Sequence, residues 1–439
     1  EFEKNQLFFC RWCGTLHQHS GSCSGPKCKR KEALIPVYFI PLNESGALGS
    51  CESCGQRGKG FAGRFIEPVK ALRAITVADV HILAQNMINA LRGPRQKVIV
   101  FTDNRQDAAF QAGWMQDHAR RYRLRHLIYE YLRQQTEPSS ISDIVEHLFK
   151  LLKADHNLAQ VLAPEVFVGR AKESYGRTVD NELKYFLRIA LMLEFGSNFK
   201  KIDCLETWGL VKVVYKDVVP ENEWIVEWSN KLKISPAELA DGVSSLLDVF
   251  RRSRSFHDEK APIFSRYWHE GDEEIQRGYL PLFTGPNGKP LGPKGIKEHL
   301  DPSDNKTWLA EFASSGGRTM SQQFVGKWGI PQELRPQFLG SLWDFVANKA
   351  RVLSPVELQG NKGGQLPGTA GSYQVSAQQM AIVLQQGRFR CNTCKRIHTR
   401  QTPNGACSAY NCSGTVKPEQ LPEDNYDLQI LNLPFSMVA

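Results

Sequence analysis

The sequence predicts a multidomain chain in which a short α/β segment and a long, mainly helical region are joined to two four-cysteine ribbons. Ten of the 11 cysteines occur in closely spaced pairs, a β-branched run is flanked by helical patterns, and apolar residues recur at helical spacing along much of the chain. The 439 residues allow two to four domains, because a domain has roughly 100–200 residues. An apolar fraction of 41% excludes disorder as the main state.

Charge and hydropathy narrow the function classes. The 55 Lys+Arg against 46 Asp+Glu give a net charge of +9, which permits a polyanionic partner and also fits ordinary solvated surface. The longest apolar stretch, around Tyr185–Phe195, contains Arg188 and Glu194 and is shorter than the roughly 20 residues of a membrane span. The acidic start, Glu1-Phe2-Glu3, does not resemble a signal peptide. We therefore expect a cytoplasmic protein with no membrane partner.

Four-cysteine units occur twice. The pattern C-x2-C-x9-C-x4-C near the start of the chain recurs as C-x2-C-x12-C-x4-C near its end. A Cys-x-x-Cys turn places two thiolates on one side of a knuckle, and two knuckles complete the tetrahedral shell that zinc prefers. The sequence therefore predicts two zinc ribbons and about two zinc ions. The predicted ligands are Cys10, Cys13, Cys23 and Cys28 in the first unit, and Cys391, Cys394, Cys407 and Cys412 in the second.

Other uses of the cysteines fit less well. Dense disulfide frameworks belong to small secreted domains, and a thioredoxin-like redox pair is not normally doubled into four-cysteine sets. Cys204 stands alone without a base nearby in sequence, so we expect a small, buried apolar residue there.

A fifth pair, Cys51 and Cys54, is a spare half-site. It could replace the second knuckle of the first unit as metal ligands, recruit His17 or His19, or bind no metal. Because the four-cysteine pattern is doubled, a self-contained first unit is favoured.

Trp12 lies inside the first knuckle. It either packs across the small core of the ribbon or stacks on an unpaired base. The other tryptophans singled out have apolar neighbours and are predicted to be core residues: Trp208, Trp224, Trp228, Trp308, Trp328 and Trp343.

An α/β segment follows the first ribbon. Thr76–Arg92 has apolar residues at helical spacing, and Lys97–Thr102 is a β-branched run typical of a strand buried in a parallel sheet. Asp103 or Asn104 can then cap a second helix. The residues after Thr102 therefore lie where the predicted strand ends and a helix begins, and in open parallel sheets ligands bind at this carboxyl edge of the strands. That helix is predicted to expose a basic face with Arg120, Arg121, Arg123, Arg125 and Arg133.

The run Val98–Ala109, VIVFTDNRQDAA, resembles motif IV at the start of the second RecA-like domain of large bacterial superfamily 2 DEAD/DEAH-box helicases. Four-cysteine insertions beside that domain also occur in this group, which includes helicases of antiphage systems such as DISARM and Druantia. The resemblance implies a partial RecA-like parallel-sheet domain, interrupted by the helical insertion. It also implies that Thr102, Asn104 and Arg105 contact the backbone of a bound nucleic-acid strand. Without it, Asn104 would be only a helix cap and Arg105 a surface charge.

Two motifs of a catalytic helicase core are missing from the sequence. Gly58-Lys59-Gly60 lacks the hydroxyl residue of a phosphate-binding loop, and Pro290 removes the amide that Gly288-Lys289-Pro290 would need. Asp272-Glu273-Glu274 is the nearest acidic cluster, but no strand precedes it. We therefore expect ATP and magnesium to be cofactors only of an intact parent protein, of which this chain is an internal segment. The chain alone should not hydrolyse ATP.

The region between the α/β segment and the second ribbon is predicted to be mostly helical. Helices followed by a strand, a flexible turn and another strand describe a winged helix, and this order occurs near Ile141–Tyr215 and Arg335–Val375. Winged helices either bind nucleic acid or serve as packing modules. In the second one, Lys349, Arg351 and Lys362 are candidate nucleic-acid contacts. The predicted helices include Ile141–Lys153, Asn181–Phe195, Pro236–Arg254 and Arg335–Asn348.

These patterns divide the chain into seven parts. They are a zinc ribbon (1–60), the start of the RecA-like domain (61–135), a helical or winged-helix-like insertion (136–260), a Gly/Pro-rich connector (261–300), a second helical or winged-helix-like part (301–386), a zinc ribbon (387–418) and a return strand toward the RecA-like sheet (419–439). We expect the return strand at Leu428–Leu433.

Two functions follow. In the first, the chain is the nucleic-acid-binding centre of an ATP-dependent DNA helicase or translocase. Its partners are then single- or double-stranded DNA, the rest of the helicase core and other subunits of a defence complex. In the second, it is a non-enzymatic zinc-ribbon and winged-helix adaptor that docks onto a protein and onto nucleic acid. Another type of hydrolase is disfavoured, because no nucleophile and base occur at usable spacing.

Overall fold

The structure is a computed structural model that describes residues 6–26, 28, 34–38, 48–49, 59–61, 64–66, 120–167, 179–196, 204–260, 293–314, 319–358, 365–421 and 425–431. The predicted helix Thr76–Arg92 and strand Lys97–Thr102 lie outside these residues. The chain divides into two compact units, residues 1–73 and 74–439. Six predicted site residues also lie outside the described residues: Cys51, Cys54, Thr102, Asn104, Arg105 and Lys362.

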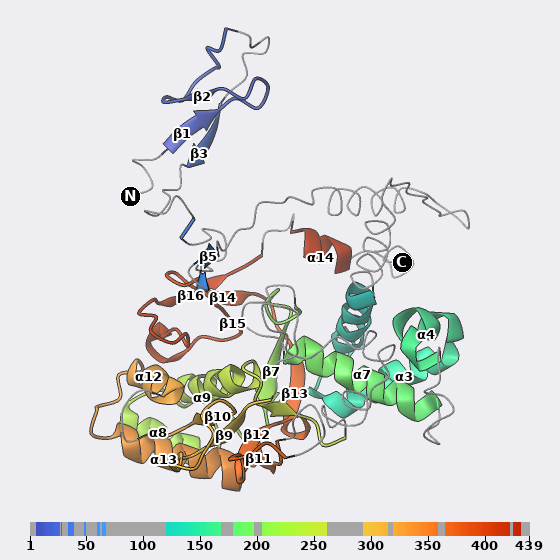
Figure 1. Cartoon of the computed structure of the whole chain (residues 1–439), viewed down its shortest axis with the longest axis vertical. Helices are drawn as coiled ribbons and strands as arrows, with labels where there is room; N and C mark the ends of the chain where they lie inside the picture. The colour runs from blue at the N-terminus through green and yellow to red at the C-terminus, as the bar shows by residue number, and fades with distance from the viewer. Residues whose placement is uncertain are drawn as a thin grey trace. The chain divides into compact units, whose positions relative to one another are not determined.

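The first unit contains a three-stranded antiparallel sheet. Its central strand is β1 (Gln6–Phe9), which pairs with β2 (Leu16–His17) on one side and β3 (Ile35–Tyr38) on the other. We call this sheet, together with the turns that carry Cys10 to Cys28, the first ribbon (Figure 1). A separate hairpin joins β4 (Lys59–Phe61) to β5 (Arg64–Ile66).

The second unit begins, among the described residues, with helix 120–133 and a group of helices beside a small sheet. Ser140 caps α3 (Ile141–Ala154) through a reciprocal capping box with Asp143, which fixes where that helix starts. The predicted helix over Asn181–Phe195 is confirmed as α7 (Val179–Phe195). The shorter elements here are β6 (Ser139–Ser140), α4 (His156–Leu162) and α5 (Pro164–Phe167).

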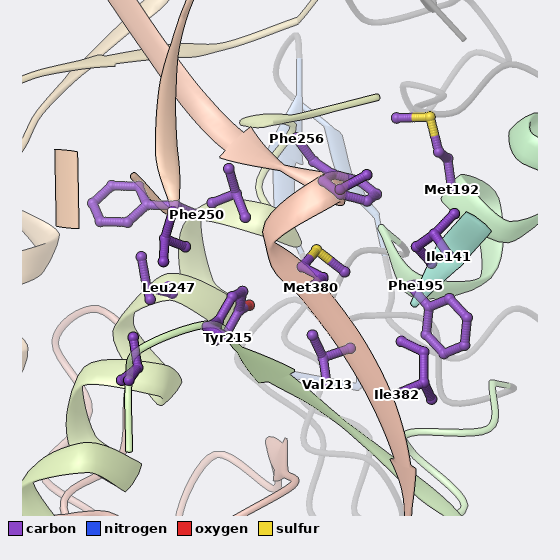
Figure 2. Packing of buried hydrophobic residues seen from close by; sticks show 14 of the residues in the cluster. Ile141, Met192, Phe195, Val213, Tyr215, Leu247, Phe250, Phe256, Met380 and Ile382 are labelled. Carbon is purple, nitrogen blue, oxygen red and sulfur yellow. The ribbon is translucent and has the colours of Figure 1, made fainter. Parts of the chain in front are cut away.

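Two strands far apart in sequence complete the small sheet. β7 (Val211–Tyr215) pairs antiparallel with β13 (Met380–Leu384), which also pairs with β6, so the order is β6-β13-β7. The register sets Tyr215 opposite Met380. Figure 2 shows side chains of α3, α7 and α9 meeting around the β7–β13 pair. The sheet is therefore closed across a long insertion, residues 216–379.

The insertion is built on aromatic packing. Trp224 stacks on Phe345 with ring centroids 4.7 Å apart, and Trp228 meets Phe338 edge-on at 5.2 Å. Its sheet has the order β10-β9-β12-β11, with β8 also paired to β12. The elements are α8 (Glu223–Leu232), α9 (Pro236–Arg251), β8 (Phe256–His257), β9 (Gly295–Lys297), β10 (Leu309–Glu311), α12 (Met320–Gly326), α13 (Arg335–Asp344), a π-helical turn (Phe345–Lys349), β11 (Leu353–Val356), β12 (Ser372–Ser376) and a 3-10 turn (Ala377–Gln379).

Core predictions hold for most of the tryptophans. Trp308 is only half-buried, and Cys204 is buried as predicted. The tryptophans confirmed as buried are Trp208, Trp224, Trp228, Trp328 and Trp343.

A second small sheet lies near the end of the chain. β14 (Arg388–Cys391) pairs with β15 (Ile397–His398) and β16 (Val416–Glu419), and a 3-10 turn (Pro403–Gly405) lies between the last two strands. We call this sheet, with its four cysteines, the second ribbon.

The predicted return strand at Leu428–Leu433 is wrong, because Tyr426–Leu431 forms helix α14. Asn425 starts the helix: its side-chain oxygen accepts from the Leu428 amide, and its carbonyl accepts from the Gln429 amide. The helix is held in place at its end, where His126 Nδ1 lies 2.9 Å from the Leu431 carbonyl oxygen.

The predicted basic exposed face of helix 120–133 is also wrong for Arg125. This guanidinium is buried, makes a 2.8 Å ion pair with Glu194 and lies over the Trp208 ring. Arg133 is exposed and pairs with Glu130. The helix therefore packs into the rest of the second unit, with part of its charge neutralised. We call the second unit without the second ribbon the body. No helix within the described residues is long and apolar enough to cross a membrane.

Candidate metal centres

The structure brings both predicted quartets together. The metal-binding atoms of Cys10, Cys13, Cys23 and Cys28 lie within 4.8 Å of one another, and so do those of Cys391, Cys394, Cys407 and Cys412. Short sulfur contacts join opposite knuckles in both quartets. They are Cys10–Cys28 at 3.7 Å, Cys13–Cys23 at 3.4 Å, Cys391–Cys412 at 3.7 Å and Cys394–Cys407 at 3.5 Å.

These distances fit a tetrahedral zinc site. With Zn–S bonds of about 2.3 Å, the edges of an ideal sulfur tetrahedron are about 3.8 Å long. A disulfide would need sulfurs about 2.05 Å apart, far shorter than any of these contacts. Four thiolates and no oxygen donor are also the donor set of structural zinc sites. Each quartet could therefore hold one zinc ion.

The two sites share a backbone framework. The Cys10 amide donates to the Thr15 carbonyl, and the Gly14 amide donates to the Cys10 carbonyl. In the second ribbon the Cys391 amide donates to Arg396 and the Lys395 amide to Cys391, at the same offsets. Gly14 and Lys395, the residues after the second cysteine of each knuckle, both have positive φ, +73° and +60°. The knuckle is thus the same structure twice.

The repetition extends beyond the cysteines. Phe8 lies opposite His17 and Pro36 in the first sheet, and Phe389 lies opposite His398 and Pro418 in the second. Both sheets have the same strand order, with the strand before the first cysteine in the centre. The sequence already contained this signal, because a histidine follows the first cysteine by seven residues in both units.

Each of these histidines contacts a ligand sulfur. His17 Nε2 lies 3.3 Å from Cys23 Sγ, and His398 Nε2 lies 3.6 Å from Cys407 Sγ. These nitrogen–sulfur distances suit an N–H donor facing a thiolate, the arrangement in which a neighbouring group orients a metal ligand. The alternative in which Cys51 and Cys54 recruit His17 or His19 involves cysteines outside the described residues, while the four sulfurs of the first quartet come together without them.

In each quartet, hydrogen bonds lower the pKa of one thiol, while burial and the contact with that thiol raise the pKa of the facing cysteine, Cys23 or Cys407. The Thr15 hydroxyl, 3.0 Å from Cys13 Sγ, lowers the pKa of Cys13 to about 6. The neighbouring Cys407 thiol lowers the pKa of Cys394 to about 5. A thiolate is the form of cysteine that binds a metal.

Close packing leaves no room for a side chain at Gly414. A Cβ there would lie 2.5 Å from Cys391 Sγ, while the Gly414 amide donates to Cys412 Sγ. The glycine therefore lets the backbone approach the sulfurs of the second quartet.

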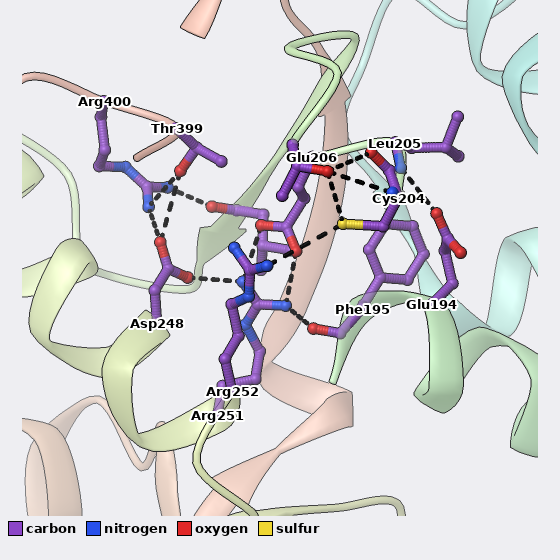
Figure 3. Close-up of polar contacts among 12 residues, drawn as sticks. Glu194, Phe195, Cys204, Leu205, Glu206, Asp248, Arg251, Arg252, Thr399 and Arg400 are labelled. Carbon is purple, nitrogen blue, oxygen red and sulfur yellow. Dashed lines mark hydrogen bonds and ion pairs between the residues drawn. The ribbon is translucent and has the colours of Figure 1, made fainter. Parts of the chain in front are cut away.

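The second ribbon is anchored to the body by buried charges (Figure 3). Arg400 donates to Asp248 at 2.5 Å and also to the Val213 carbonyl. The same carboxylate accepts from Arg251, which makes a second, two-pronged pair with Glu206. All four side chains are buried. This network joins the ribbon, β7 and α9.

Hydrogen bonds to backbone carbonyls add to this anchoring. Lys327 Nζ donates to the carbonyls of Cys407 and Ala409, and Asn404 donates to the Trp328 carbonyl. The second ribbon is therefore anchored to the rest of its unit, while its cysteines form a small apolar cluster of their own with Ala409 and Val416.

The first ribbon differs in exposure. Trp12 is 54% exposed, Leu16 55% and Ile35 39%. The expectation that Trp12 packs across the ribbon core is therefore wrong, because more than half of this side chain faces solvent.

Among the predicted nucleic-acid contacts, the structure describes Lys349 and Arg351. Arg351 is exposed and precedes β11 with φ +52°. Nearby Lys349 lies 3.5 Å from Asp344 in an exposed ion pair.

Comparison with known proteins gives no match: no family model, no curated protein and no solved structure matches the chain.

Proposed function

We propose that the chain is the nucleic-acid-binding segment of an ATP-dependent superfamily 2 DNA helicase or translocase of the kind used in antiphage defence. One zinc ion in each quartet holds a ribbon in shape, and the chain by itself does not hydrolyse ATP. The observation that carries this proposal is the charge of the first ribbon. Residues 4–31 contain six Lys/Arg and no Asp or Glu.

Charge of this kind suits a phosphate backbone. A ribbon segment with no acidic residue attracts polyanions without internal competition. The second ribbon is also rich in arginine, but there the charges are used internally. Arg388 and Arg390 pair with Glu419, and Arg400 pairs with Asp248. The first ribbon is therefore the better candidate for the contact with nucleic acid.

The topology of one part of the second unit is compatible with the winged helix of the helicase hypothesis. With the short helices α4 and α5 set aside as an insertion between α3 and α7, helix 120–133, β6, α3, α7, β7 and β13 have the order of a winged helix, and the sheet order β6-β13-β7 is also typical of one. In this reading, α7 would be the recognition helix, yet most of its side chains are buried. The winged helix then serves as a packing module, and the insertion 216–379 takes the place of its wing.

Binding assays with the full chain test the proposal. We expect labelled single-stranded DNA to bind, with an affinity whose logarithm falls linearly with the logarithm of salt concentration. Replacing Lys29 and Lys31 by Glu should weaken binding and lower the salt slope by about two. The matched control is Lys216→Glu, an exposed position in the other unit. No binding to DNA or RNA even at low salt would overturn the proposal.

The adaptor function has one observation in its favour. Leu16 and Ile35 are the two cross-strand neighbours of Phe9, and both are exposed. Such an apolar row across a sheet suits a protein partner. Loss of a protein contact on Leu16→Ser/Ile35→Ser, with nucleic-acid affinity unchanged, would favour this function.

A further inference from the structure

The two ribbons have the same knuckle but different residues at its tip. Arg11 and Trp12 lie between the cysteines of the first knuckle, where the second has Asn392 and Thr393. In the second ribbon these positions are used internally. Thr393 donates to Asn392 Oδ1 at 3.1 Å, and the same oxygen accepts from the Thr415 amide. The tip of the second knuckle thus closes its own ribbon.

Both tips are exposed, but only the first carries a large ring and a guanidinium. Arg11 and Trp12 are both exposed. The turn that carries them is fixed by the Cys10–Thr15 and Gly14–Cys10 hydrogen bonds and by the convergence of four cysteines. A large aromatic ring is therefore presented to solvent on a short, constrained turn, beside a guanidinium.

We infer that Arg11 and Trp12 form a stacking platform for an unpaired base of single-stranded nucleic acid. This inference rests on the proposed function and names its ligand class. An exposed indole supplies a flat apolar surface that every base can cover, and a neighbouring arginine contacts the phosphate or the base face. Paired bases inside a duplex do not offer their faces, so the platform selects single strands.

Charge complementarity decides between nucleic acid and protein as the occupant. The six Lys/Arg of residues 4–31, with no acidic residue among them, surround this knuckle in sequence. A polyanion with unpaired bases can pair with these positive charges and also stack on the Trp12 ring. An apolar protein surface could contact the ring but would leave the charges without a partner of opposite sign.

The test compares variants of the full chain with a labelled oligothymidylate and with a duplex of the same length. Trp12→Ala should weaken binding to the single strand by about 5- to 100-fold, the range expected for loss of one stacked base. Binding to the duplex should change by less than about twofold. Trp12→Phe should restore most of the single-strand affinity, because a phenyl ring also stacks. Thr393→Ala, the same position in the second knuckle, should have no effect.

Zinc content separates a lost platform from a misfolded ribbon. If Trp12→Ala loses a zinc ion, the inference is tested with the binding affinities of Arg11→Ala and Trp12→Phe instead, since both variants keep part of the platform. With Arg11→Ala, single-strand affinity should fall and salt dependence should weaken, while zinc content stays unchanged.

The outcomes distinguish the inference from the proposed function. If the wild-type chain binds oligothymidylate and zinc-replete Trp12→Ala binds it equally well, the platform is refuted while nucleic-acid binding stands. If equal losses occur on single strand and duplex, the knuckle is only a phosphate contact and the platform is again refuted. If the wild-type chain binds neither probe, the proposed function itself fails.

Discussion

His398 occupies in the second ribbon the position that His17 occupies in the first, and each imidazole lies against the third cysteine of its own quartet. The Nε2–Sγ distances are 3.6 Å and 3.3 Å. Each histidine also lies opposite a phenylalanine of the central strand, Phe389 or Phe8. The repeated unit is therefore four ligands plus a supporting histidine.

Removing the supporting histidine should weaken zinc binding without abolishing it. We expect His17→Ala and His398→Ala each to lower the zinc affinity of its own site by about 10- to 100-fold, the usual effect of losing a partner that orients a ligand. Competition with a zinc chelator measures this affinity. His19→Ala is the control, because His19 is exposed and lies two residues after His17 in sequence. Unchanged affinity in both histidine variants would show that the contacts are incidental.

Loss of a ligand should have different consequences in the two ribbons. Cys407→Ser should lower the free energy of unfolding of the second unit by about 4 kcal/mol or more, because its ribbon is anchored in the core. Cys23→Ser should lose one zinc ion and leave the main thermal transition unchanged, since the first ribbon belongs to the other compact unit. Calorimetry on both variants checks this. A large fall in the main transition for Cys23→Ser would contradict the separation.

Asp248 should make stability sensitive to acid. Burial alone would raise the pKa of Asp248, but the guanidiniums of Arg400 and Arg251 together hold it below its ordinary value of 3.8. A carboxylate with a lowered pKa stabilises the fold above the ordinary value, and this contribution is lost as the pH falls through the folded-state pKa.

Asp248→Asn should therefore cost about 3–5 kcal/mol at neutral pH, the cost of breaking a buried ion pair. The difference from the wild type should shrink as the pH falls below about 4. Urea unfolding at several pH values measures it, and Asp217→Asn, at an exposed site, should stay within about 0.5 kcal/mol. A difference that grows toward acid pH would contradict the assignment.

The spare pair should be dispensable for zinc. The first quartet is complete with Cys10, Cys13, Cys23 and Cys28. We expect Cys51→Ser/Cys54→Ser to keep the full zinc content, measured by elemental analysis. Loss of one ion would show that these cysteines compete for the first site.

Local patterns predicted the parts of the fold that depend on neighbours in sequence. The quartets follow from spacing, and α3, α7 and α9 follow from apolar residues at helical intervals, because both signals need no distant partner. The pairing of β7 with β13 could not be predicted from local patterns. Tyr215 and Met380 lie opposite each other in the sheet, but the whole of residues 216–379 separates them in sequence.

The burial and pairing of charged side chains were the features hardest to predict from the sequence. Arg125 looked like a surface residue, but its partner, Glu194, lies 69 residues away. The same holds for Arg400 and Asp248, which no helical pattern connects. The exposure of Trp12 could not be predicted either, because a tryptophan in this knuckle could equally pack in the ribbon core or stack on a base. Where a buried ion pair or an exposed ring is decided by three-dimensional neighbours, periodicity carries no information.

The zinc content of the folded full chain, measured by elemental analysis and native mass spectrometry, tests the account most directly. The two converged quartets predict about two zinc ions per chain, with one lost on Cys23→Ser and the other on Cys407→Ser. A correctly folded chain that contains no zinc, or whose content is unchanged in both variants, would contradict it.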